Sequence, residues 1–191
     1  EAQESRNDGS MTLMDHLKEL RNRVFKSMVA MLLGGIIVYF FYDSVYRFAV
    51  QPYCEAIKET SQDTCQLLFT SLTAPFATKL RVSTYAGLLL ASPVIFWQLW
   101  SFIAPGLYRK EKRYAISFVA SSVILFSLGA ALAYVSLPAI FEWLINEAGD
   151  ATVQSRGEDY FSLLTLMVGA FGLSFEFPLL LLALQLMGIV T

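Results

Sequence analysis

The chain has 191 residues, of which 55% are apolar and 16% are charged. Soluble domains usually carry roughly 25% charged residues, so this composition argues against a single soluble core. The formal net charge of -2 excludes neither a soluble nor a membrane protein. Most of the charged residues, however, lie in short polar segments between four long apolar stretches. This pattern is typical of a multi-pass membrane protein.

The N-terminal residues precede the first apolar stretch. Residues 1–10 are polar and acidic, and we expect a disordered tail there, followed by one transmembrane domain over residues 11–191. Residues 11–23 predict an amphipathic helix, because leucines recur there at the spacing of one helical face.

Each of the four apolar stretches is long enough to cross a bilayer, since a helix needs about 20 residues at roughly 1.5 Å each. We expect spans at about residues 24–42, 82–102, 114–137 and 161–187. Pro93 lies inside the second span and predicts a bend. Trp97 and Trp100 are expected at the membrane interface near the end of that span.

The segments between the spans are expected to be loops. We expect residues 43–79 to form an outer cap around Pro52, which could include a short surface helix, and residues 138–160 to form a second outer loop.

Basic residues predict the orientation, because cytoplasmic flanks of spans are enriched in Lys and Arg. Four bases lie in residues 11–26 and four in residues 103–113, whereas residues 138–160 hold only Arg156. We therefore expect the N-terminus and the loop between the second and third spans to face the cytoplasm. An even number of spans returns the C-terminal end of this chain to the same side.

The two cysteines, Cys54 and Cys65, both fall in the first outer segment. That side is oxidising in bacteria, so a disulfide is one prediction and two unpaired thiols are the alternative. No metal site and no cofactor are predicted, since His16 is the only histidine and the cysteine spacing is not that of a zinc site.

Glu176 is a carboxylate expected deep inside the fourth span. A charge at that depth costs at least about 2.5 kcal/mol, so we expect the side chain to face a partner or a wet cavity. A structural hydrogen bond to a neighbouring span is the alternative. Pro178, two residues later, frees a backbone carbonyl and predicts a bend.

Three motifs carry residues that are unusual for their location. They are His-Leu-Lys-Glu-Leu-Arg at 16–21, Phe-Ile-Ala-Pro-Gly-Leu-Tyr at 102–108, and Phe-Gly-Leu-Ser-Phe-Glu-Phe-Pro at 171–178. In order and spacing, from about residue 12 to 190, the chain resembles the TatC family, the multi-span receptor subunit of the twin-arginine protein translocase.

The resemblance implies an all-α integral membrane fold with six spans, shaped like a cupped hand. Four of the six would be present here, so we expect either a fragment or a protein that lacks the last two spans. The implied function is a receptor for twin-arginine signal peptides of folded cargo in the bacterial cytoplasmic (inner) membrane, driven by the proton-motive force. The implied partners are TatA and TatB, further copies of the chain, and the bilayer. No nucleic acid and no enzyme activity are implied.

The resemblance also implies a receptor site on the carboxylates of Glu19 and Glu111. Carboxylates suit two adjacent guanidinium groups because they form bidentate pairs that lysine cannot reproduce. The predicted site includes three neighbours, Arg21, Phe102 and Tyr108, and Pro105 is expected to shape the loop between Phe102 and Tyr108. The alternative for Glu19 is an i,i+4 ion pair with Arg23 on a solvated helix face.

For the membrane interior, the resemblance implies a polar patch that contacts TatA or TatB, with Glu176, Pro178 and Tyr134 as members. A function of another class is a small proton- or ion-coupled transporter that uses Glu176. The absence of an internal sequence repeat disfavours it. A membrane enzyme is disfavoured because one intramembrane Glu and one interfacial His supply no nucleophile–base set.

Overall fold

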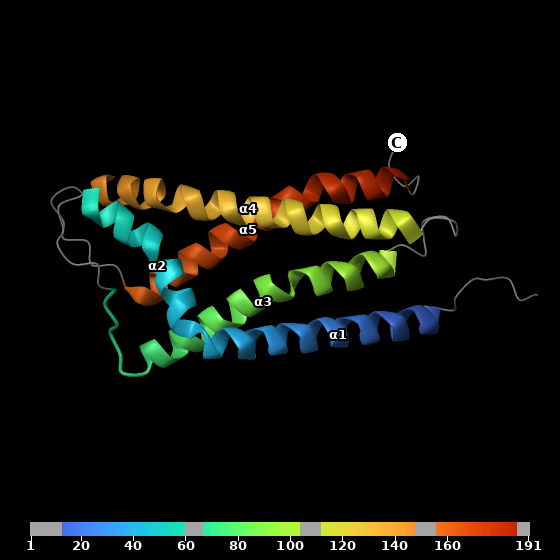
Figure 1. The fold of residues 1–191 in the computed structure, drawn as a ribbon, viewed down its shortest axis with the longest axis horizontal. Helices are drawn as coiled ribbons and strands as arrows, with labels where there is room; N and C mark the ends of the chain where they lie inside the picture. Colours follow the sequence, from blue (N-terminus) through green and yellow to red (C-terminus); the bar gives the residue numbers. More distant parts are fainter. Residues whose placement is uncertain (1–12, 60–66, 104–111, 148–155, 187–191) are drawn as a thin grey trace, which may run out of the picture.

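The computed structural model describes residues 13–59, 67–103, 112–147 and 156–186. These residues form five α-helices and no strand apart from one isolated bridge, as Figure 1 shows. The helices are α1 (Leu13–Phe40), α2 (Tyr42–Glu59), α3 (Ala74–Ile103), α4 (Lys112–Glu147) and α5 (Gly157–Leu186).

Four of these helices are long and apolar enough to cross a membrane, which confirms the predicted number of spans. They cover His16–Phe40, Ala74–Ile103, Ile116–Glu147 and Gly157–Gln185. The remaining helix, α2, has 18 residues and lies almost entirely within residues 43–79, where the sequence predicts an outer cap.

The N-terminal amphipathic segment is not a separate element. It forms the first turns of α1, which runs without interruption into the span. The junction holds neither proline nor glycine, so nothing in the sequence stops the i→i−4 hydrogen bonds from continuing.

The outer segments contain more helix than the sequence indicated. The loop expected at 138–160 is wrong over its first part, because α4 continues through Pro138 to Glu147. The residues after Pro138 stay largely apolar, and neighbouring groups in membrane proteins can compensate for the hydrogen bond that a proline removes. The spans also begin earlier than expected: α3 starts at Ala74, and α5 starts at Gly157 with two acids in its first turn.

The helices pack mainly as two pairs, α1 with α3 and α4 with α5, while α3 also contacts α4 (Figure 1). Glycines allow both close approaches. A Cβ added at Gly34 would lie 2.6 Å from the carbonyl oxygen of Gly87, and one at Gly129 would lie 2.7 Å from that of Phe171. Backbone therefore meets backbone where each pair crosses, as is common between membrane helices.

A buried aromatic cluster joins α2 to α4 and to the start of α5. Its largest members are Tyr53, Phe141, Tyr160 and Phe161. The Tyr160 hydroxyl donates a hydrogen bond to the backbone carbonyl of Ala49, across from α5 to α2. Pro52 is fully buried within α2. This cluster holds α2 against the bundle at the end where α3 and α5 begin.

Candidate functional site

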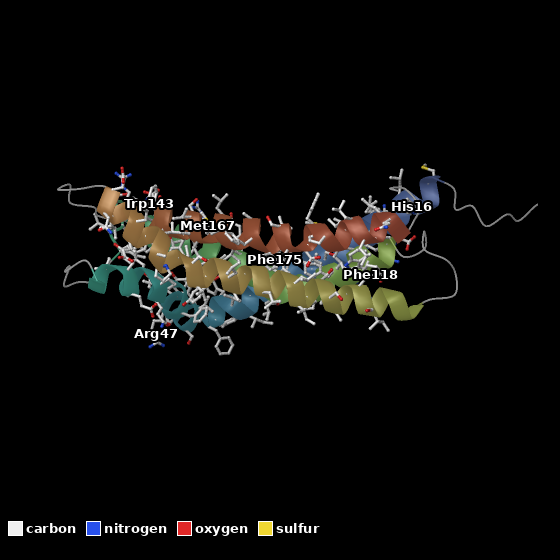
Figure 2. The ribbon with its side chains drawn as sticks, turned by 90° about the horizontal axis from the view of Figure 1, so that it is seen from above. His16, Arg47, Phe118, Trp143, Met167 and Phe175 are labelled. Atoms are coloured by element: carbon white, nitrogen blue, oxygen red, sulfur yellow. The ribbon has the colours of Figure 1, made fainter. Side chains whose placement is uncertain are left out.

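The first two sequence motifs meet at one end of the bundle. The imidazole of His16, in the first turns of α1, stacks on the ring of Phe102 near the end of α3, with 4.4 Å between centroids and 22° between planes. Figure 2 shows His16 at this end of the molecule and Trp143, on α4, at the other. Segments more than eighty residues apart in sequence are thus brought together on one surface.

Glu19 lies one helical turn along α1 from His16. Its Oε1 accepts hydrogen bonds from Arg23 Nε at 3.0 Å and Arg23 Nη2 at 2.5 Å. This is the i,i+4 ion pair that is the alternative to a receptor role for Glu19. Both bonds end on Oε1, so Oε2 has no partner among the described residues. The carboxylate therefore has one engaged oxygen and one that can accept a ligand donor.

The other members of the predicted receptor site are only partly described. Arg21 is exposed on α1. Pro105, Tyr108 and Glu111 lie outside the described residues, as does Cys65. The pairing of Glu19 with Glu111 in one site stays a prediction.

A second polar arrangement crosses three helices inside the membrane. Glu176 on α5 is 5% exposed and Ser122 on α4 is 0% exposed. The Trp100 indole on α3 donates its Nε1–H to Ser122 Oγ at 2.7 Å, and Ser122 lies beside the carboxyl of Glu176. Glu176 Oε1 has no partner among the described residues. The structure therefore places an unpaired carboxyl oxygen of Glu176 beside a hydrogen bond that joins α3 to α4.

Sequence reasoning missed Ser122 and assigned Trp100 to the membrane interface. Trp100 is instead 3% exposed and stacks on Phe118 with 4.8 Å between ring centroids. Trp97, one turn earlier, is exposed. Only the position of Glu176 could have indicated the site, because a buried carboxylate needs donors from neighbouring helices.

Tyr134 does not lie with Glu176. Its hydroxyl donates to the backbone carbonyl of Phe48 at 2.7 Å, and its ring stacks on that of Phe48 with 4.6 Å between centroids. Tyr134 lies twelve residues from Ser122 along α4, about 18 Å at 1.5 Å per residue. The structure therefore associates Tyr134 with α2. Pro178 is exposed on α5, which continues through it, as α3 continues through Pro93.

Cys54, on α2, is disulfide-bonded. Its pairing with Cys65 stays a prediction, since Cys65 lies outside the described residues. Within the described part of the chain, no cluster of three or more His, Cys, Asp or Glu side chains could hold a metal ion.

Comparison with known proteins identifies the family. The family model described as "Sec-independent protein translocase protein (TatC)" matches residues 15–191. A protein of that name from Frankia casuarinae is 38% identical, over 96% of this chain and 53% of its own length. The Escherichia coli protein of that name is 32% identical, over 96% of this chain and 70% of its own.

A solved structure agrees with these matches. The crystal structure titled "Twin Arginine Translocase Receptor- TatC" superposes with a TM-score of 0.82 and 36% identity, over 92% of this chain and 77% of that one. The concave, cupped arrangement expected for the helices is consistent with this match. The present chain spans about half the length of the Frankia relative. It is a multi-pass membrane protein, and it belongs to the TatC family of Sec-independent protein translocases.

Proposed function

We propose that the chain recognises twin-arginine signal peptides and forms a core part of a translocase that moves folded proteins across the cytoplasmic membrane. The observation that carries this proposal is the likeness to a structure titled as the twin-arginine translocase receptor, at a TM-score of 0.82. The contact of His16 with Phe102 supports it, because it joins two of the family-like motifs at one end of the bundle.

The chemistry of recognition follows from Glu19. An incoming guanidinium can bond to Oε2, or it can displace Arg23 from Oε1. The side chains of Arg23 and Glu19 are only 22% and 23% exposed, so water screens a charge-assisted hydrogen bond less there than on an open surface. Glu111 would supply the second carboxylate for the second arginine. A lysine at either ligand position would lose the bidentate geometry.

The proposed orientation puts the His16 end in the cytoplasm. Basic residues flank that end, as in cytoplasmic loops generally. The disulfide-bonded Cys54 supports the same orientation, because it lies on α2 at the opposite end, and disulfides persist on the oxidising side of the membrane.

The proposed partners are the single-span proteins TatA and TatB, with self-association in the complete complex. Glu176 supports a partner contact, because its buried Oε1 lacks a donor within the described residues and a neighbouring span could supply one. We assign no enzyme activity to the chain. A proton-coupled transporter built on Glu176 is not favoured, because the match to translocase proteins covers nearly the whole chain.

The proposal is tested by peptide binding to the protein in nanodiscs. We expect binding of a twin-arginine signal peptide, weaker binding of the twin-lysine version, and a loss of at least about tenfold in the Glu19→Ala/Glu111→Ala double variant, because each lost charge-assisted bond is worth about 1.5–3 kcal/mol. Glu55→Ala is the matched control, because Glu55 is exposed on α2, and this variant should bind normally. Equal binding of the two peptides, or normal binding by the double variant, would refute the assigned site.

A further inference from the structure

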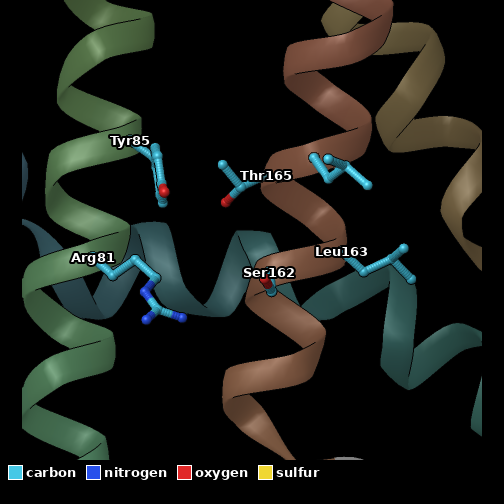
Figure 3. Close-up of a pocket in the computed structure, with 6 residues that line it drawn as sticks. Arg81, Tyr85, Ser162, Leu163 and Thr165 are labelled. Carbon is cyan, nitrogen blue, oxygen red and sulfur yellow. The ribbon is translucent and has the colours of Figure 1, made fainter.

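A pocket lined by both polar and apolar groups lies between α3 and α5, away from both sites described above. Its volume is about 580 Å³, and its lining comprises Arg81, Tyr85, Ser162, Leu163, Thr165 and Leu166. Figure 3 shows Arg81 and Tyr85 projecting from α3, and Thr165 from α5, toward the space between the two helices. The lining contains one full positive charge and no acid.

Arg81 is the feature that the fold leaves unexplained. It lies inside the span Ala74–Ile103, its side chain is exposed, and it makes no ion pair or hydrogen bond with any described residue. An arginine in a membrane-spanning helix is costly unless an anion or water meets it. A guanidinium favours planar and tetrahedral oxyanions such as carboxylate and phosphate.

The depth of the pocket matches the depth of lipid phosphates. Arg81 lies seven residues from the start of α3, and Ser162 and Thr165 lie five and eight residues from the start of α5. At about 1.5 Å per residue, both helices place these groups roughly 8–12 Å from their ends. The headgroup layer occupies about 5–8 Å on each side of the hydrocarbon core, so the pocket lies near its inner boundary.

The remaining lining residues suit a headgroup with attached chains. Tyr85 and Ser162 provide hydroxyl groups, whereas the Thr165 hydroxyl donates to the backbone carbonyl of Phe161 at 2.7 Å. Leu166 is 66% exposed and offers an apolar surface beside the polar groups. Free phosphate would use the guanidinium but would gain nothing from the leucines.

We propose that this pocket binds a membrane phospholipid, with the Arg81 guanidinium on the lipid phosphate, Tyr85 and Ser162 as hydroxyl partners, and an acyl chain against Leu166. The lipid belongs to the outer leaflet, an assignment that rests on the orientation given under the proposed function. Binding itself does not depend on that orientation or on signal-peptide recognition.

Native mass spectrometry of the detergent-solubilised chain tests the proposal by measuring affinity for three ligands. They are phosphatidylglycerol, diacylglycerol with the same acyl chains, and inorganic phosphate. We expect phosphatidylglycerol to bind more tightly than diacylglycerol, and Arg81→Gln to weaken phosphatidylglycerol by about tenfold without affecting diacylglycerol. Arg47→Gln is the matched control, because Arg47 is exposed on α2 and, within the described part of the chain, donates to the backbone carbonyl of Asp43 alone.

Arg81→Lys, which keeps the positive charge, replaces Arg81→Gln in the test if Arg81→Gln does not fold. We expect Arg81→Lys to bind phosphatidylglycerol more weakly than the native chain does, but more tightly than the native chain binds diacylglycerol. Equal effects of Arg81→Gln and Arg47→Gln would overturn the site. Displacement of phosphatidylglycerol by millimolar inorganic phosphate would overturn the lipid as its occupant. Neither result would bear on signal-peptide binding, which is measured separately.

Discussion

Removing the Ser122 hydroxyl should lower the free energy of unfolding by much more than removing the hydroxyl of an exposed serine on the same helix. In Ser122→Ala, the Trp100 indole loses its acceptor, in a site where Ser122 is 0% exposed and Trp100 is 3% exposed. Hydrogen bonds between membrane helices are worth about 0.6–1.7 kcal/mol each. Because the buried indole N–H is also left without an acceptor, we expect a loss of about 1–3 kcal/mol in the free energy of unfolding.

Ser127→Ala is the matched control for this prediction. Ser127 also lies on α4, but its hydroxyl is exposed and, among the residues that the structure describes, bonds only to the Val123 carbonyl of its own helix, at 2.6 Å. We expect a change of at most about 0.5 kcal/mol there.

The assay is reversible unfolding in mixed micelles with an increasing fraction of denaturing detergent. A double-mutant cycle with Trp100→Phe should give a coupling energy of about 0.6–1.7 kcal/mol. Equal losses in Ser122→Ala and Ser127→Ala, or a coupling energy near zero, would refute the hydrogen bond between Trp100 and Ser122.

Three further outcomes follow from the same geometry. Gly87→Ala should lower the free energy of unfolding, because a Cβ there would meet the backbone of α1. Gly169→Ala is the control and should not lower it, since a Cβ there would have nothing within 4 Å. Equal effects of the two substitutions would contradict the close contact between α1 and α3. Glu19→Gln should change the free energy of unfolding by less than about 0.5 kcal/mol, because the ion pair of Glu19 with Arg23 is a local i,i+4 contact. The same substitution should weaken binding of the signal peptide. A large loss of stability would instead show that Glu19 has a structural role. Burial, aided by the charges of Tyr46 and Asp43, raises the pKa of Tyr42 from 10.0 to about 12. The neutral Tyr42 side chain therefore contributes fully to the free energy of unfolding below pH 10.0, and this contribution is lost as the pH rises through about 12. An ultraviolet titration of Tyr42→Phe should lack a tyrosinate step near pH 12, and an unchanged titration would contradict the burial of Tyr42.

The number of spans could be predicted because apolar length is a local property of the sequence. Their ends could not, because a helix continues wherever its backbone hydrogen bonds remain satisfied. Pro138 is an example: it read as the end of a span, but α4 continues past it for nine residues to Glu147. The start of α3 at Ala74 was missed because Lys79 and Arg81 lowered the local hydropathy. Lys79 instead lies over the Tyr39 ring, 4.3 Å from its centroid.

The interior polar site could be predicted only in part. Glu176 was identified because a carboxylate in an apolar helix is unusual. Its neighbours depend on how α4 is rotated against α5, which the contact of Gly129 with the backbone of Phe171 helps to fix. That rotation turns Ser122 toward Glu176 and leaves Ser127 exposed. Spacing along one helix carries no information about a contact between two helices, so Ser122 could not be distinguished from other serines of α4.

The position of the bound signal peptide tests the receptor assignment most directly. A photoreactive group at Leu20, which is exposed beside Glu19 on α1, should crosslink to a twin-arginine peptide in nanodiscs, and the yield should fall with a twin-lysine peptide. The same group at Trp143, exposed at the opposite end of the bundle, should give no such crosslink (Figure 2). Crosslinking from position 143 but not from position 20, or equal yields with both peptides, would contradict recognition at the His16–Phe102 end.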